Sequence, residues 1–161
     1  NPEPGFRELK TAKLVAEQFG ALGLQPRSGL AATGVRADAV GSAPGPTLAI
    51  LGELDSLIVA DHPDADSNTN AAHACGHHCQ IGMMLGAAMA LTNSDVLDSL
   101  SGRLAFMAVP AEEYIEIEYR DGLRRDGKIE FLGGKPELVR LGEFRSEERR
   151  VGKEWRSRWA P

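Results

Sequence analysis

Two continuous runs of apolar residues constrain the fold of this chain more than any other feature. One occupies residues 47–51 (Thr-Leu-Ala-Ile-Leu), and the other lies within residues 103–109 and stops before Pro110. Short apolar runs without alternation are typical of strands buried on both faces, as in the centre of a parallel sheet. Such a sheet needs helices on its faces. We therefore expect an α/β fold, a three-layer sandwich with a largely parallel central sheet.

The segments around these runs supply further elements. Apolar residues recur at three- and four-residue steps over residues 9–22 and again over residues 81–91, which predicts two amphipathic helices. Residues 33–40 alternate like a half-buried strand, and residues 42–46, rich in Pro and Gly, predict a turn. The order helix, strand, strand, helix, strand agrees with a layered α/β domain.

The carboxyl-terminal part of the body is less clear. Residues 134–142 predict a short helix, because Pro136 lies near its start and Gly142 just past its end. Residues 114–119 alternate like a strand, yet their Glu-rich composition also allows a helix. Both structures remain open for that segment.

Composition excludes several classes of function. The 161 residues include 18 Lys and Arg against 23 Asp and Glu, a formal charge of −5, which disfavours binding to nucleic acid. The apolar runs are far shorter than the roughly 20 residues of a membrane helix, so no membrane association is expected. The first residues lack the pattern of a secretory signal. Two cysteines, Cys75 and Cys79, cannot build a disulfide framework, which favours a reducing, cytoplasmic compartment.

The last 17 residues differ from the rest of the chain. Residues 145–161 hold six basic and three acidic residues and both tryptophans, without a stable apolar period. This tail resembles the in-frame translation of a sequencing adapter. A basic amphipathic tail that meets a membrane or an acidic partner is the alternative. We expect one partial catalytic domain over residues 1–144 and an artefactual tail over residues 145–161.

A cluster of potential metal ligands lies at residues 73–79. The sequence His-Ala-Cys-Gly-His-His-Cys holds three of the four histidines and both cysteines of the chain. Imidazole and thiolate are the ligands that zinc and similar ions prefer, and Gly76 allows the backbone to turn so that Cys75 and His77 face one ion. Polar caps with a buried thiol, or a redox pair of Cys75 and Cys79, are the alternatives. The clustering favours a metal site.

Acidic residues follow both apolar runs. The segment Pro-Ala-Glu-Glu at 110–113, with Glu112 and Glu113, comes directly after the run that ends at Val109, and Glu53 and Asp55 follow the run at 47–51. Open α/β sheets build their sites beyond the carboxyl ends of the strands, so we expect both groups at one edge. One carboxylate of an adjacent pair can bind a metal while its neighbour activates a water molecule.

Four motifs in this order resemble one family of enzymes. Gly-Glu-Leu-Asp at 52–55, His-Ala-Cys-Gly-His at 73–77, Leu-Gly-Ala-Ala at 85–88 and Val-Pro-Ala-Glu-Glu at 109–113 are similar to those of dinuclear-metal amidohydrolases and peptidases. This group includes aminoacylase, carboxypeptidase G, aminobenzoyl-glutamate hydrolase and indole-acetyl-amino-acid hydrolase. The resemblance covers residues 1–144 and implies hydrolysis of amide bonds in N-acyl amino acids or dipeptide-like substrates.

The resemblance also implies roles for individual residues. Cys75, His77 and Glu113 would be metal ligands, and Glu112 the general base that activates water. Asp55 would orient a ligand imidazole, and His73 would have a similar supporting role. Two divalent ions of zinc, manganese or cobalt would be bound, the substrate would be a small molecule, and complete members often dimerise through a lid domain.

Several departures from the family pattern bear on activity. His78 stands where relatives carry Asp, and Cys79 is unusual. No histidine follows Glu113, although the family takes two further histidine ligands from that part of the chain, and the lid sequence is absent. The sequence therefore predicts an amino-terminal fragment that is inactive alone. A non-catalytic module with one structural ion is the alternative, and the number of bound ions separates it from a dinuclear enzyme.

Overall fold

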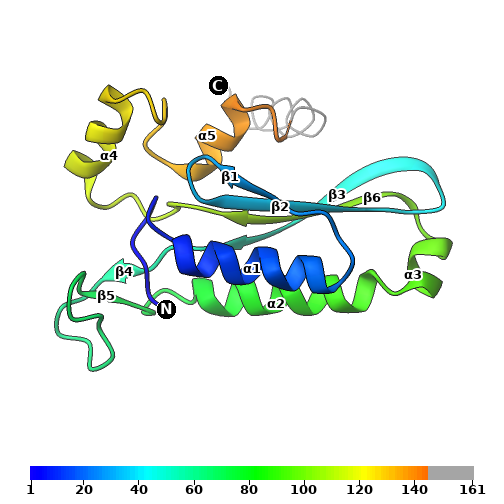
Figure 1. Cartoon of the computed structure of the whole chain (residues 1–161), viewed down its shortest axis with the longest axis horizontal. Coiled ribbons are helices and arrows are strands. Elements are labelled where there is room, and N and C mark those ends of the chain that lie inside the picture. Colours follow the sequence, from blue (N-terminus) through cyan, green and yellow to red (C-terminus); the bar gives the residue numbers. More distant parts are fainter. Residues whose placement is uncertain (145–161) are drawn as a thin grey trace, which may run out of the picture.

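The computed structural model describes residues 1–144, whose elements are labelled in Figure 1. The tail at residues 145–161 lies outside the described residues, so its interpretation as an artefact stays a prediction.

A four-stranded mixed sheet forms the centre of the domain. Its strands stand in the order β1, β2, β6, β3. Their bounds are Arg27–Leu30 for β1, Gly34–Val40 for β2, Ala43–Glu53 for β3 and Ser101–Val109 for β6. β1 pairs with β2 and β2 with β6 in antiparallel fashion, whereas β3 and β6 are parallel, with Ile50 opposite Phe106. The carboxyl ends of β3 and β6 therefore meet at one edge.

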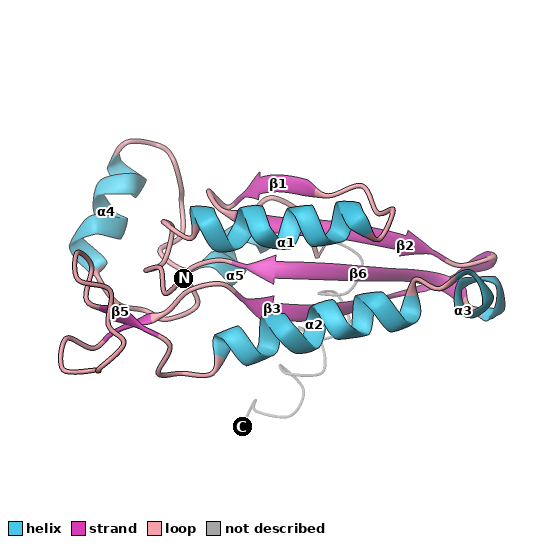
Figure 2. Ribbon diagram, turned by 60° about the horizontal axis from the view of Figure 1, so that its bottom comes forward, coloured by secondary structure: helices cyan, strands magenta, loops and turns pink. Residues whose placement is uncertain are grey.

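Two helices cover one face of this sheet. α1 (Leu9–Ala21) and α2 (His77–Leu91) lie side by side, beneath the strands in Figure 1 and in front of them in Figure 2. Phe19 of α1 and Met84 of α2 are buried in the same core cluster as Phe106 of β6. These helices confirm the predictions for residues 9–22 and 81–91.

A third helix covers the opposite face. α5 (Gly134–Arg140) lies across the sheet from α1 and α2 in Figure 1. Its Leu138 is buried together with Met107 and Val109 of β6, whose side chains point away from α1 and α2. Helices on both faces confirm the three-layer α/β class, and α5 confirms the short helix predicted at residues 134–142.

The prediction of a strand buried on both faces is correct for one apolar run and wrong for the other. In β6 all residues from Leu104 to Val109 are buried. β3 pairs with β6 on one side and stands at the edge of the sheet, so that Leu48 is 61% exposed. The predicted turn at residues 42–46 is also displaced, because β3 already begins at Ala43.

The sheet is mixed rather than largely parallel, which corrects that part of the expectation. The chain reverses at Gly41 and Ser42 between β2 and β3, so these two strands run in opposite directions. The connection from β3 to β6 contains α2 and makes that pair parallel, as crossovers through a helix do. β6 lies between β2 and β3 and is therefore antiparallel to β2.

The remaining elements are short. They are β4 (Leu57–Ile58), β5 (Ala71–Ala72), α3 (Ser94–Ser99) and α4 (Ile117–Arg125). For the ambiguous segment at residues 114–119, the structure has a loop followed by the first turn of α4. Over the described part of the chain, none of the helices has the length and apolar character needed to cross a membrane.

Candidate metal centre

The carboxyl edge of the parallel pair gathers side chains from three segments. Glu53 ends β3, Glu112 and Glu113 follow β6, and His77 is the first residue of α2. The expected meeting of the two acidic groups at one edge is thus observed, with the His/Cys cluster beside them.

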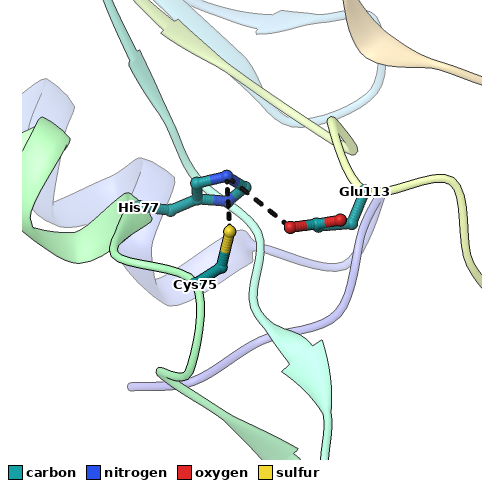
Figure 3. Close-up of side chains that lie close together, drawn as sticks. All are labelled: Cys75, His77 and Glu113. Atoms are coloured by element: carbon teal, nitrogen blue, oxygen red, sulfur yellow. Dashed lines mark hydrogen bonds and ion pairs between the residues drawn. The ribbon is translucent and has the colours of Figure 1, made fainter.

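Local backbone geometry places Cys75 next to His77. Gly76 has a φ of 97°, a left-handed conformation that glycine adopts without strain. The turn brings Cys75 Sγ to 3.5 Å from His77 Nε2 just before α2 begins. Figure 3 shows the thiol and the carboxylate of Glu113 both directed at this imidazole.

The ring of His77 is oriented by Asp55. Nδ1 of His77 lies 2.9 Å from the backbone oxygen of Asp55 and 3.3 Å from its Oδ1. Because both neighbours of Nδ1 are acceptors, Nδ1 donates its proton to them, and Nε2 is the ring nitrogen that faces the remaining side chains of the cluster. The Asp55 side chain is fully buried, and its Oδ2 accepts the N–H of Glu113 at 2.9 Å. Asp55 therefore connects the imidazole with the acidic loop.

Four further side chains that could donate an electron pair to a metal ion surround Nε2 of His77. Glu53 Oε2 lies at 2.9 Å, Glu112 Oε2 at 3.7 Å and Glu113 Oε1 at 3.9 Å, in addition to the Cys75 thiol. Two groups have ligand atoms within 4.8 Å of one another: Cys75, His77 and Glu113, and Glu53, His77 and Glu112. Both groups share the single nitrogen Nε2.

The electrostatics of the cluster favour a cation. The hydrogen bond to Glu113, some burial and the nearby carboxylates raise the pKa of the Cys75 thiol to about 11, because they disfavour a thiolate. Burial likewise raises the pKa of Asp55. Lys135 Nζ contacts Glu53 and lies 3.3 Å from Glu112 Oε1. Nitrogen, sulfur and carboxylate donors together are the set that zinc and related ions bind, so these residues fit a divalent transition ion.

Three of the singled-out residues lie apart from the donor groups. His73 Nδ1 is 3.2 Å from the Ser56 hydroxyl, and its ring is 4.7 Å from that of His78. Cys79 is exposed and free, as is Cys75. Cys75 and Cys79, the pair of the redox alternative, therefore form no disulfide in this structure.

For two residues of the candidate metal centre, Glu53 and Lys135, the sequence predicted no individual role. Glu53 is expected only as part of the segment after β3, and Lys135 lies in the helix α5, 82 positions further on. The position of Glu53 at the carboxyl end of β3 gives a usable signal, since open α/β sheets build their sites at the carboxyl ends of strands. A lone lysine on a short helix gives no such signal.

Comparison with known proteins finds relatives among the amidohydrolases and peptidases that the sequence motifs resemble. No protein-family profile matches the chain. Thermostable carboxypeptidase 2 of Saccharolobus solfataricus is 35% identical over 117 residues, which are 70% of this chain and 29% of the relative. The N-acyl-L-amino acid amidohydrolase of Geobacillus stearothermophilus is 31% identical over 145 residues, 88% of this chain and 34% of the relative.

Solved structures agree with these relatives. Bacillus subtilis YxeP, described as a dinuclear metal binding peptidase of the M20 family, has a TM-score of 0.62 and 30% identity, covering 71% of this chain and 32% of that one. The chain is thus a homologue of the M20 family of dinuclear-metal amidohydrolases and peptidases. It spans only about a third of the length of the relatives it matches.

Proposed function

We propose that this domain carries part of the active site of a metal-dependent hydrolase that cleaves amide bonds in N-acyl amino acids or dipeptide-like, aminobenzoyl-glutamate-like substrates. The observation that carries the proposal is the donor set around His77 Nε2 at the carboxyl edge of β3 and β6. Relatives named as an amidohydrolase and a carboxypeptidase support this reaction class.

Each residue of the cluster has a role in this proposal. Cys75, His77 and Glu113 would hold a divalent ion, and Asp55 orients the imidazole through its backbone oxygen. When bound, the ion supplies Lewis acidity that polarises the amide carbonyl and makes water more acidic. Glu112 accepts the proton of the attacking water and delivers it to the leaving amine.

We assign the supporting features in the same proposal. His73 supports the site from its position beside Ser56. The whole enzyme would use two ions of zinc, manganese or cobalt, act in the cytoplasm on a small molecule, and dimerise through a lid.

Cobalt absorption tests the metal ligands. A thiolate ligand gives a sulfur-to-cobalt charge-transfer band, which we expect in the wild-type chain. Cys75→Ser should abolish the band, whereas Cys79→Ser should keep it, because Cys79 is also an exposed thiol but lies outside the donor groups. A band that survives in Cys75→Ser would contradict the ligand assignment.

A structural site for one ion is the second candidate. It is favoured by the fact that both donor groups share one imidazole nitrogen, while Nδ1 is engaged by Asp55. The stoichiometry of metal in the longest natural form of the protein distinguishes the two: two ions per chain support the hydrolase, and one ion with no hydrolysis supports the structural role.

A further inference from the structure

The loop that carries the two glutamates of the centre begins in an unfavourable backbone conformation. Ala111, which directly precedes Glu112, has a φ of 48°. For a residue with a Cβ, this left-handed region costs free energy and persists only where the surroundings hold it. The contacts of Ala111 therefore decide where Glu112 and Glu113 lie.

A buried carboxyl group contacts the Ala111 backbone from one side. Glu8, just before α1, is fully buried. Its Oε1 accepts the N–H of Ala111 at 2.8 Å, and its Oε2 accepts the hydroxyl of Thr33. Glu8 thus ties the start of α1 and the start of β2 to the acidic loop.

A buried guanidinium contacts the same loop from the other side. Arg120 of α4 is 1% exposed. Its Nη1 donates to the backbone oxygen of Ala111 at 3.2 Å and of Leu132 at 2.8 Å, and its Nη2 donates to the backbone oxygen of Glu113. A side chain on Gly5 would crowd this arrangement, since its Cβ would lie 2.5 Å from Arg120 Nη2.

Most hydrogen bonds of the Glu8 and Arg120 side chains join them to backbone atoms of the loop at residues 111–113. Buried charged groups are weak contributors to net stability, because the loss of hydration offsets what they gain. What the contacts do provide is a fixed path for residues 111–113, held at the N–H of Ala111 and at the carbonyls of Ala111 and Glu113.

We propose that Glu8 and Arg120 are positioning residues that hold the Ala111 to Glu113 backbone so that Glu112 and Glu113 face His77. The effect on metal affinity rests on the proposed function, whereas the effect on the loop does not. Neither side chain is among the donors around Nε2, so each acts through the loop.

The experiment compares two buried glutamates that each hold a loop. Glu137 of α5 is 1% exposed and accepts the N–H groups of Glu130 and Phe131, both at 3.0 Å. Glu8→Ala, Glu8→Gln and Glu137→Ala are prepared in the full 161-residue chain. Amide hydrogen exchange at Ala111 and Glu113 is measured by NMR without metal, and the affinity for Co²⁺ is measured by absorption.

We expect Glu8→Ala to speed exchange at Ala111 and Glu113 by about tenfold, the value of one lost hydrogen bond, and to weaken Co²⁺ binding by about 10- to 100-fold, as for other groups that support metal ligands. Glu8→Gln should restore both, because its amide oxygen can still accept from Ala111. Glu137→Ala should leave both unchanged.

The outcomes separate the two proposals. Loss of protection in Glu8→Ala without any Co²⁺ binding by the wild-type chain would support the positioning role and refute the metal centre. Unchanged exchange at Ala111 and Glu113 in Glu8→Ala would overturn the positioning role, as would an equal effect of Glu137→Ala at those two amides.

Discussion

At the scale of single residues, burial makes Glu8 a source of pH dependence. Burial raises its pKa to about 7, although hydrogen bonds from Thr33 and Ala111 act in the opposite direction. The folded chain therefore holds a proton here that the unfolded chain releases near the ordinary glutamate pKa of 4.5. The contribution of Glu8 to stability is therefore greatest below pH 4.5, and about 3 kcal/mol of it is lost as the pH rises through 7.

We therefore predict that Glu8→Gln is close to wild type in stability at pH 5 and more stable at pH 8, by a few kcal/mol at most. Denaturant unfolding at both pH values measures this. Glu137→Gln is the control of opposite sign. Burial raises the pKa of Glu137, but hydrogen bonds from Arg140 and backbone N–H groups outweigh it and lower the pKa. Its loss should cost stability at pH 8, and the cost should shrink as the pH falls below the ordinary glutamate pKa of 4.5. A Glu8→Gln variant that is less stable than wild type at pH 8 would contradict the prediction.

The residues of the centre were predictable to different degrees. Cys75, His77 and Glu113 converge as expected, because their sequence clustering and their place after a strand both predict proximity. Glu8 and Lys135 could not be found in this way. Their contacts depend on how α1 and α5 pack against the sheet, and neither residue belongs to a dense cluster in the sequence.

At the scale of elements, the close approach of α5 to the end of β6 limits which side chains fit. A Cβ on Gly134, the first residue of α5, would overlap the backbone oxygen of Pro110. Gly134→Ala should therefore destabilise the domain by about 1 to 3 kcal/mol, as overpacking does. Gly122→Ala in α4 is the matched control. Nothing lies within 4 Å of its added Cβ, and alanine favours helices, so it should stabilise slightly. Thermal unfolding of both variants measures this, and a neutral Gly134→Ala would refute the close contact.

The pattern of apolar residues predicted where helices and strands lie in the sequence better than it predicted which strands are neighbours in the sheet. Periodicity located α1, α2 and β2 correctly, and a continuous apolar run located β6. It could not distinguish a central strand from an edge strand, because the run in β3 is as continuous as that in β6 while its pairing depends on distant segments. β1 was missed because its four residues carry no alternating pattern.

At the scale of the whole molecule, one imidazole limits what the chain can do alone. Over residues 1–144 both donor groups depend on Nε2 of His77, and one nitrogen lone pair binds one ion at a time. We predict no more than trace hydrolysis of N-acetyl amino acids by the 161-residue chain with added manganese or zinc. Product release followed by liquid chromatography checks this. Clear turnover that a chelator abolishes would show that these donors suffice.

The position of β3 has a consequence for how the purified chain behaves in concentrated solution. Within residues 1–144 its outer edge has no partner strand, and residues 47–51 carry no charge to repel a second copy. Unprotected edges of this kind template aggregation. Leu48→Lys should slow the growth of turbidity, whereas Met89→Lys, at a residue of α2 that is 64% exposed against 61% for Leu48, should have little effect. Equal protection by both variants would assign the effect to added charge alone.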